Sequence, residues 1–458
     1  MRTTWLCLSI LLGSLVAVVP VQADMSQGEL RLKAMEEKLN ALHEPDLKVN
    51  YGPHGVKSTK DVKASYGKKG FRLETGNELF QTNLQWRAQM RYSGVHSSDP
   101  RSPGDFTRLG TSNFELRRVR MKIGGHGYKP WLKYYFEVDL QPSTNTLGGN
   151  QSRNTRSRVI DWRIDVQPWD FLGIRVGQWK VNYNRERVDS SGRQQFVERS
   201  IVNRQFTIDR QVGVMAQGRL FKGTHAELRY YAGVFNGEGK GVNNPDDNHM
   251  YMARIQWNFL GRDLKWRQSD VKFHKKPAGS LAFATAHNTG VCTRWSSSGC
   301  GNLSRYVAPG TAGQQTEAYE IEQYLEEFAF KWQGLSLQQE YHWKNIRDTA
   351  NIIMVNKDYM DGGYGQIGYF PHGLISAVPE GLEVAFRYAV VNEPDRSIVP
   401  QGVFNENMRE EFTGALNYFI AGHNNKVTLD VSYLNLQDAS TNRFYDDGRV
   451  RLQWDISF

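Results

Sequence analysis

The last ten residues of the chain alternate strictly between apolar and polar side chains. Val450, Leu452, Trp454, Ile456 and Phe458 share one parity, and arginine, glutamine, aspartate and serine fill the other. Successive side chains of a β-strand point to opposite faces, so this period of two predicts a strand with one apolar and one polar face. The same alternation recurs at residues 132–140, 160–167, 382–390 and 426–433.

Segments with this period of two fill the chain from about residue 78 onward. They run about 10–14 residues, whereas strands of soluble domains are commonly about five or six residues long. Polar turns separate them. We predict sixteen strands, at residues 79–93, 113–125, 129–141, 157–168, 171–181, 210–221, 225–236, 248–260, 279–287, 317–332, 335–347, 361–370, 381–392, 410–421, 425–436 and 448–458.

Long amphipathic strands in an even number predict an all-β fold, a transmembrane antiparallel β-barrel. In lipid every backbone N–H and C=O must find a partner, and strands meet that demand only by closing into a barrel. A barrel of about sixteen strands encloses an aqueous channel, whereas a barrel of about eight is filled by side chains. The alternative is a large soluble antiparallel protein, whose one-sided sheets alternate in the same way.

The first 23 residues have the composition of a secretory signal peptide. Arg2 supplies a positive charge, residues 5–19 are apolar but shorter than a transmembrane helix needs, and residues 21–23 (VQA) form a small-residue cleavage site. The alternative is a retained N-terminal anchor. A signal peptide followed by barrel strands predicts a location in the bacterial outer membrane, with membrane lipid as a partner.

Residues 24–44 predict a short helix or coiled coil, because Leu32, Met35, Leu39 and Leu42 follow a 3-4-3 spacing. About two heptads are marginal in water, so the segment needs partners. A trimeric coiled coil and a plain amphipathic helix both fit. We interpret residues 45–77 as a linker and lead-in to the barrel, and the predicted barrel occupies residues 78–458.

Composition narrows the function without deciding it. Lysine and arginine total 57 and aspartate and glutamate 48, which leaves a net charge of +9 over 458 residues. A mild basic excess suits nucleic acid, acidic membrane surfaces or small anions. Nucleic-acid binding is not expected here, because the basic residues alternate along strands and would point into a lumen.

Two cysteines follow the signal peptide, Cys292 and Cys300, amid glycine and serine. In an oxidising compartment they could close a small loop through a disulfide, and two free thiols are the alternative. No second cysteine or histidine pair accompanies them in the sequence, so no metal site is expected.

One connection, residues 182–209 between the fifth and sixth predicted strands, is unusually long and charged. A long connection in a compact fold is usually functional, and in a wide barrel it could fold inward and narrow the lumen. The alternative is a solvated external loop whose charges pair with one another. Its candidate constriction residues are Arg185, Arg187, Arg193, Glu198 and Arg199.

Several blocks of sequence resemble one family of outer-membrane proteins. Residues 114–120 (FELRRVR) look like the early LRRAR strand of the phosphate-selective porins O and P. Residues 175–180 (RVGQWK), 190–191 (SS) and 196–200 (FVERS) resemble the GQFK…SS…FMERS block of that family. The likeness departs from the family at residues 181–183 (VNY), where a proline and an aromatic residue are usual.

The resemblance continues to the C-terminus and covers nearly all of the chain after the signal peptide. Residues 233–237 (GVFNG) and 363–370 (GYGQIGYF) resemble later strands of the family, and Phe458 resembles the terminal aromatic residue that such barrels present to the barrel assembly machinery. The resemblance implies a homotrimer of sixteen-stranded porins whose third long loop forms the eyelet. Phosphate-selective members line the anion path with arginines and lysines.

Strand parity decides which residues of this chain could line such a path. In the second strand Val119, Met121 and Ile123 face lipid, because an arginine or lysine on that face costs about 2–4 kcal/mol at the midplane. Arg117 shares their parity, which places it near an interface or a subunit contact unless a bulge turns it inward. The opposite parity gives the candidate pore-lining residues Arg87, Arg91, Arg118, Arg120, Lys122, Lys133, Arg163 and Arg175.

A channel lined by arginine and lysine is expected to conduct small anions, possible solutes including phosphate. Arginine keeps its charge and offers a planar fork that fits phosphate oxygens, and a basic ring at a narrow point excludes cations. A general or sugar-type porin without anion specificity stays open, as does a plugged adhesin or anchor. The general porin stays open because acidic residues share the lumen parity: Glu137, Asp139, Asp161, Asp165, Glu227 and Asp455.

No motif in the sequence indicates enzymatic chemistry. No GxxxxGK[ST] loop, HExxH or CxxC appears, and no local signature joins a serine to a histidine. The sequence therefore predicts neither catalysis nor a cofactor. His342 lies on a strand at lumen parity beside Glu340 and Lys344, and we expect it to be a residue of the pore wall.

Overall fold

The computed structural model describes residues 62–67, 69–95, 99–107, 110–141, 158–296, 299–303, 306, 318–349, 357–394, 406–439 and 441–458. The predicted signal peptide, the predicted coiled coil at 24–44 and the first part of the predicted linker lie outside these residues. Among the described residues, no helix reaches the length and hydropathy that a membrane-spanning helix requires.

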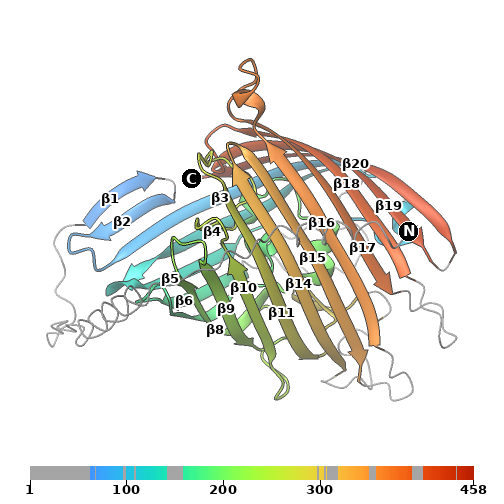
Figure 1. The fold of residues 1–458 in the computed structure, drawn as a ribbon, viewed down its shortest axis with the longest axis horizontal. Helices are drawn as coiled ribbons and strands as arrows, with labels where there is room; N and C mark the ends of the chain where they lie inside the picture. The colour runs from blue at the N-terminus through green and yellow to red at the C-terminus, as the bar shows by residue number, and fades with distance from the viewer. Residues whose placement is uncertain are drawn as a thin grey trace, which may run out of the picture. The chain divides into compact units, whose positions relative to one another are not determined.

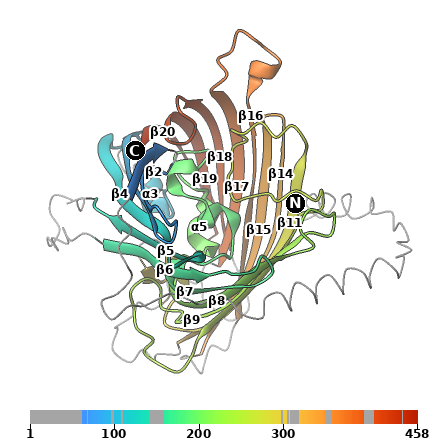
Figure 2. The same cartoon turned by 90° about the vertical axis from the view of Figure 1, so that its left-hand side faces the viewer.

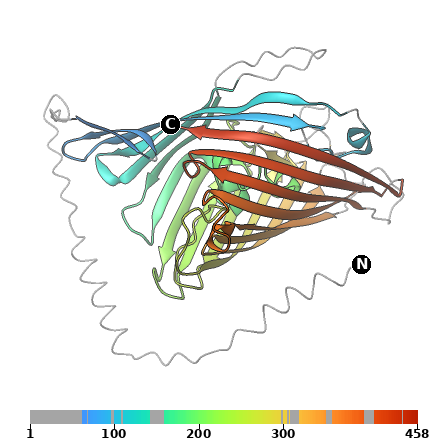
Figure 3. The ribbon, with the colours of Figure 1, turned by 90° about the horizontal axis from the view of Figure 1, so that it is seen from above.

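Sixteen antiparallel strands form a closed barrel (Figures 1 and 2). The barrel closes because β20 pairs with β3, from Val450 opposite Gly94 to Ser457 opposite Arg87 (Figure 3). This confirms the predicted architecture. The strands are β3 (Gln81–Gly94), β4 (Asn113–Gly127), β5 (Lys129–Asp139), β6 (Arg158–Val166), β7 (Gly173–Lys180), β8 (Arg210–Leu220), β9 (Leu228–Phe235), β10 (Met250–Trp257), β11 (Ala278–Gly290), β14 (Tyr319–Trp332), β15 (Leu335–Asp348), β16 (Lys357–Tyr369), β17 (Leu382–Pro394), β18 (Glu406–Phe419), β19 (Asn425–Asp438) and β20 (Arg443–Ser457).

The alternation of the sequence sorts the side chains between the two faces of the barrel. Along β20, Leu452 and Trp454 are 45% and 40% exposed on the outer face, whereas Arg451 and Gln453 are 2% exposed on the inner face. Lipid chains suit the apolar outer face. The inner face is buried by protein, so its polar groups need protein partners.

A hairpin precedes the barrel, in the region that the sequence interpretation treats as linker and lead-in. β1 (Val62–Gly67) pairs with β2 (Gly70–Thr75), and β2 pairs with the first residues of β3. β2 thereby occupies the place beside β3 beyond the end of β20. Six-residue strands offer too few alternations for a period of two to stand out among glycines and lysines.

Short helices and one further hairpin lie in the connections between barrel strands. Three of the helical turns belong to a single connection, between β7 and β8. These smaller elements are α3 (Pro103–Phe106), α4 (Arg185–Val188), η1 (Ser191–Arg193), α5 (Ile201–Phe206), β12 (Arg294–Ser296), β13 (Gly299–Gly301) and η2 (Pro371–Gly373).

Candidate functional site

The connection between β7 and β8, residues 181–209, lies inside the barrel, and we call it the inner loop. It carries α4, η1 and α5, and α5 is visible within the barrel in Figure 2. Most of its side chains are buried. Its hydrogen-bond partners include inward-facing side chains of β3, β4, β10, β11 and β14–β19, so the segment occupies part of the lumen.

Carboxylates of the barrel wall hold the inner loop by its backbone. Four backbone N–H groups of the loop donate to four different wall carboxylates, all of which are 0–2% exposed. Each such bond satisfies a buried donor that would otherwise lack a partner. The donors and acceptors are Arg185 N and Glu327 (3.2 Å), Glu186 N and Glu340 (2.6 Å), Val197 N and Asp430 (3.0 Å), and Ile201 N and Glu411 (3.0 Å).

Gln195 anchors the middle of the inner loop. Its side-chain N–H donates to Glu383 at 2.7 Å and to Ser336 at 3.1 Å, and its side-chain oxygen accepts from Gln366 at 2.9 Å. Its backbone N–H donates to Gln268 at 2.6 Å. The side-chain amide of Gln195 thereby ties the loop to β15, β16 and β17, and its backbone N–H ties the loop to the connection after β10.

Glu198 gathers three arginines at the end of the loop that faces β3 and β4. Its carboxylate accepts from Arg91 at 2.7 Å, from Arg117 at 2.8 Å and from Arg118 at 3.2 Å. Glu115 also lies 3.4 Å from Arg91, so three guanidinium groups face two carboxylates and the cluster keeps an excess of positive charge. It also fixes the inner loop to β3 and β4, two strands that carry predicted pore-lining residues.

Arg117 reaches this cluster because β4 contains a bulge. The register between β3 and β4 shifts at Gln89 and Met90, which lie opposite Arg118 and Leu116 and leave Arg117 as the extra residue. A bulge re-aims a side chain that the alternation would send to the other face. The sequence left three placements open for Arg117: a membrane interface, a subunit contact, or an inward position at a bulge. The structure has the inward position at a bulge.

The Glu198 cluster should withstand mild acid. Burial raises the pKa of Glu198, but the guanidinium groups of Arg118, Arg91 and Arg117 outweigh burial and hold this pKa well below its ordinary value of 4.5. The stabilisation from a lowered pKa is complete above about pH 4.5 and is lost only as the pH falls further, through the folded-state pKa.

Thermal unfolding followed by circular dichroism should therefore give the same difference in Tm between the wild type and Glu198→Gln at about pH 7 and about pH 5. That difference should shrink well below about pH 4.5. A difference that already shrinks between about pH 7 and pH 5 would contradict the lowered pKa.

Arg87 lies between β3 and the inner loop and is held by neutral groups. Its guanidinium donates to the hydroxyl oxygen of Ser190 at 2.8 Å and of Ser191 at 2.7 Å. It is 4% exposed, and no ion pair joins it to a carboxylate among the described residues. Hydroxyl groups fix the position of this arginine without cancelling its charge.

Arg199 is held in the same way by carbonyl oxygens of the loop itself. It donates to the backbone oxygens of Glu186 at 2.8 Å and Asp189 at 2.7 Å, and Lys180 also donates to the Asp189 oxygen at 3.1 Å. Burial and the nearby charge of Arg187 lower the pKa of Arg199 to about 10, so it stays cationic at neutral pH. Three lysines follow this pattern: Lys331 with Ser269 O (2.9 Å), Lys344 with Gln205 O (3.2 Å) and Lys426 with Gln194 O.

The other predicted pore-lining and constriction residues fall into two groups. The side chains of Lys122, Lys133 and Arg193 form no hydrogen bond or ion pair with any described residue, and Lys133 is exposed. The remaining arginines are ion-paired. Their pairs are Arg120 with Glu137 (3.1 Å) and Asp139 (3.1 Å), Arg163 with Asp165 (3.2 Å), Arg175 with Asp165 (2.5 Å), Arg185 with Glu327 (2.7 Å), and Arg187 with Asp209.

A second segment inside the lumen was missed by the sequence analysis. It is the connection of residues 258–277 between β10 and β11. Its Gln268 binds the inner loop, its Arg267 pairs with Asp189, and its Ser269 donates to Glu383 at 2.9 Å. Its length was the feature of the sequence that could have revealed it, since most connections in compact folds are about four to six residues long.

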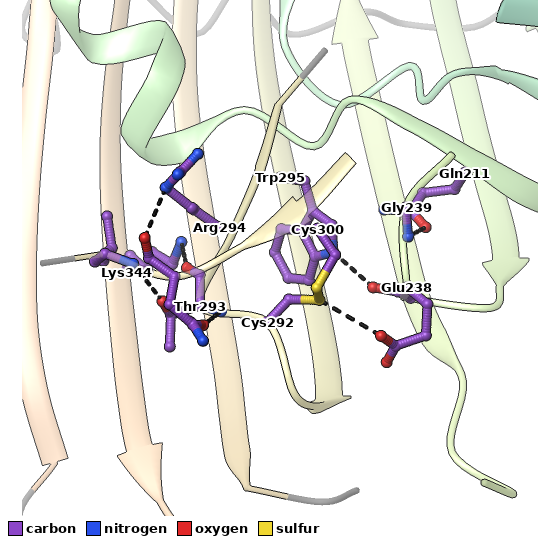
Figure 4. The surroundings of a disulfide bond; sticks show 12 residues. Gln211, Glu238, Gly239, Cys292, Thr293, Arg294, Trp295, Cys300 and Lys344 are labelled. Carbon is purple, nitrogen blue, oxygen red and sulfur yellow. Dashed lines mark hydrogen bonds between the residues drawn. A yellow bond between two sulfur atoms is a disulfide. The ribbon is translucent and has the colours of Figure 1, made fainter. Parts of the chain in front are cut away.

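A disulfide-bonded hairpin covers the inner loop from another side (Figure 4). Cys292 and Cys300 are joined, and they flank β12, which carries Trp295. Trp295 is 1% exposed, donates from Nε1 to the Gly237 oxygen at 2.5 Å, and belongs to the same buried apolar cluster as Phe206 of α5. The hairpin therefore packs on the inner loop.

A model of the family described as phosphate-selective porin O and P matches residues 81–456. No curated protein matches the chain. Similar solved structures include a loop L8 deletion mutant of OmpT, an outer membrane protein of Vibrio cholerae (TM-score 0.54, 8% identity, covering 83% of this chain and 100% of that chain), OmpF of Salmonella typhi in complex with daunomycin (0.52, 12%, 84% and 100%), and the outer membrane channel DcaP of Acinetobacter baumannii (0.50, 11%, 84% and 99%). At these identities the likeness shows the fold alone.

Proposed function

Because the chain belongs to the phosphate-selective porin O and P family and is a porin of the bacterial outer membrane, we propose that it conducts small anions, phosphate among them, by passive diffusion. The inner loop is its constriction, and the working molecule is a homotrimer. A barrel of sixteen strands supports this proposal, since it is wide enough for an aqueous path beside a folded loop.

The observation that carries the anion preference is the set of cations held by neutral oxygens. Arg87 and Arg199 are fixed against the inner loop by hydroxyl and carbonyl groups. Their positions are set, and their charges are not cancelled by a directly bonded carboxylate. Preorganised positive charge at a narrow point attracts anions and repels cations without any rearrangement during passage.

The position of the carboxylates on the barrel wall supports the same proposal. The sequence left a general porin open because acidic residues share the lumen parity. Glu327, Glu340, Glu411 and Asp430 lie beneath the inner loop, where they accept its N–H groups. Glu327, Glu411 and Asp430 also form ion pairs with arginines, so their negative charges are compensated.

A general porin remains the second candidate, and one observation favours it. Arg120 and Arg175 each pair with a carboxylate on a neighbouring strand, and Arg163 pairs with Asp165 of its own strand, so this wall carries opposed charges. Opposed rows give a transverse field rather than a net charge. The two candidates therefore differ in the sign and size of ion selectivity, which is measurable.

The test is the reversal potential of the purified protein in a planar bilayer under a KCl gradient. We expect a chloride-preferring potential, and phosphate should reduce the chloride current. Arg199→Met removes one charge, which is worth about 1 kcal/mol to an anion about 4 Å away in water, a factor of about five in the permeability ratio. Arg199→Lys keeps the charge and should keep most of the preference.

Lys222→Gln is the matched control, because Lys222 is an exposed lysine of the connection after β8 and pairs with Asp170. It removes the same charge and should leave the reversal potential unchanged. A near-zero or cation-preferring potential in the wild type would overturn the anion proposal and leave the general porin. Chloride preference without any effect of phosphate would retain an anion channel and remove phosphate from its solutes.

A further inference from the structure

The Cys292–Cys300 disulfide closes a hairpin that several groups hold inside the barrel. Lys344 of β15 donates to the Thr293 oxygen, and its ammonium lies 5.6 Å from the centre of the Trp295 ring. The disulfide joins the two ends of this hairpin, so it limits how far Trp295 can move away from the inner loop.

A buried carboxylate lies directly beside this disulfide (Figure 4). Glu238, from the connection after β9, is 3% exposed, and its Oε2 is 3.5 Å from Cys292 Sγ. A disulfide sulfur has no proton to donate, so this is a contact and not a hydrogen bond. Among the residues that the structure describes, no lysine or arginine pairs with Glu238, which is unusual for a buried acidic group.

We propose that Glu238, Cys292 and Cys300 form a binding site for a thiophilic divalent cation such as Zn²⁺ or Cd²⁺ when the disulfide is reduced. One oxygen and the two sulfur atoms lie within 4.8 Å of one another. Two thiolates on one zinc lie at most about 4.6 Å apart, given Zn–S bonds of about 2.3 Å, and the sulfurs separate once their bond is broken. Thiolate and carboxylate are established zinc ligands, and water completes the fourth position.

The chemistry balances with a phosphine as the reductant. The phosphine supplies two electrons to the S–S bond and becomes a phosphine oxide, whose oxygen comes from water. The two sulfurs take up two protons and become thiols. Binding of the divalent cation then displaces both thiol protons. In the metal-bound form, two thiolates and one carboxylate surround a cation of charge 2+.

A metal bound to Cys292 and Cys300 would join the two ends of the hairpin, as the disulfide does. The loop that carries Trp295 would then have two closed forms, one covalent and one through the metal, and an open form with free thiols. Glu238 gains a partner in this scheme, because its carboxylate oxygen is then bonded to the metal. This inference does not depend on which solute the channel conducts.

The experiment titrates Cd²⁺ into the full-length protein in detergent before and after treatment with a phosphine reductant, and records the thiolate-to-cadmium absorbance. We expect one Cd²⁺ per chain after reduction and none before. Glu238→Gln should weaken binding by about ten-fold or more, since even outer groups of metal sites are worth about 10–100-fold. Glu380→Gln, on an exposed carboxylate of the connection after β16, is the matched control and should bind as the wild type does.

Zn²⁺ should also slow maleimide labelling of the reduced thiols, and this protection should be lost in Glu238→Gln. Equal Cd²⁺ affinity in Glu238→Gln and wild type would overturn the proposed ligand set. Binding of equal stoichiometry to the oxidised protein would place the metal elsewhere. A disulfide that a phosphine cannot reduce in the folded protein would also overturn the proposal, because the metal-bound form could not be reached.

Discussion

Replacement of Glu198 with glutamine should destabilise the barrel by about 3 kcal/mol and increase its preference for anions. Glu198 is the shared acceptor of Arg91, Arg117 and Arg118, and Arg91 is almost fully buried. Removal of one partner from a buried ion network costs about 3–5 kcal/mol. We expect the lower end of that range, because the Arg117 side chain is 36% exposed and can turn towards water.

The loss of stability should appear in guanidinium unfolding in detergent. The stronger preference for anions should appear in the reversal potential. Glu115→Gln is the matched control, since Glu115 approaches Arg91 at 3.4 Å and Arg117 at 3.9 Å and is not their main partner. We expect it to cost less than about 1 kcal/mol, as loosely paired charges do. Equal costs for the two variants would show that Glu198 has no special position in the cluster, and an unchanged potential in Glu198→Gln would separate the cluster from the ion path.

The barrel could be predicted from the sequence because lipid imposes a strict rule on the outer face. Every predicted strand corresponds to a strand of the structure, and errors concentrate at the ends. β11 was predicted to end at residue 287 and continues to Gly290, where Asn288 and Thr289 interrupt the alternation. Strand ends project beyond the apolar band, so lipid no longer selects their outward side chains.

The side of the barrel that each candidate residue faces could also be predicted, but its partner could not. Parity placed Arg87 and Arg91 on the inner face of β3, and both bind the inner loop. Their partners are more than one hundred residues away along the chain. Whether a lumen arginine is neutralised by a carboxylate or held by a carbonyl oxygen depends on those distant contacts.

Two features of the site were not predicted from the sequence. The connection of residues 258–277 was long enough to attract notice, but only its contacts place it inside the lumen. Glu238 gave no signal, since it reaches Cys292 from a different connection. A sequence search for metal ligands counts nearby cysteines and histidines, and it misses a third ligand that the fold supplies.

Gly368→Ala should loosen the inner loop more than any other single methyl group added to β16. A Cβ at this position would lie 1.8 Å from Nε2 of Gln195 and 2.8 Å from Oε1 of Glu383. The methyl group therefore takes the place of the amide that anchors the middle of the loop. Overpacking of this kind costs about 1–3 kcal/mol, and the displaced amide also loses its bonds to Glu383 and Ser336. Single-channel recordings should show a larger and less steady current.

Gly365→Ala is the matched control, because it lies on the same strand and its added Cβ meets no atom within 4 Å. It should leave both stability and current unchanged. Gln195→Ala removes the amide that the methyl group would strike, so the effect of Gly368→Ala should shrink in the double variant. Residues in contact show such non-additivity, whereas independent sites add. Additive costs in this cycle would mean that Gly368 acts on the barrel itself, and the inner loop would then owe its position to other contacts.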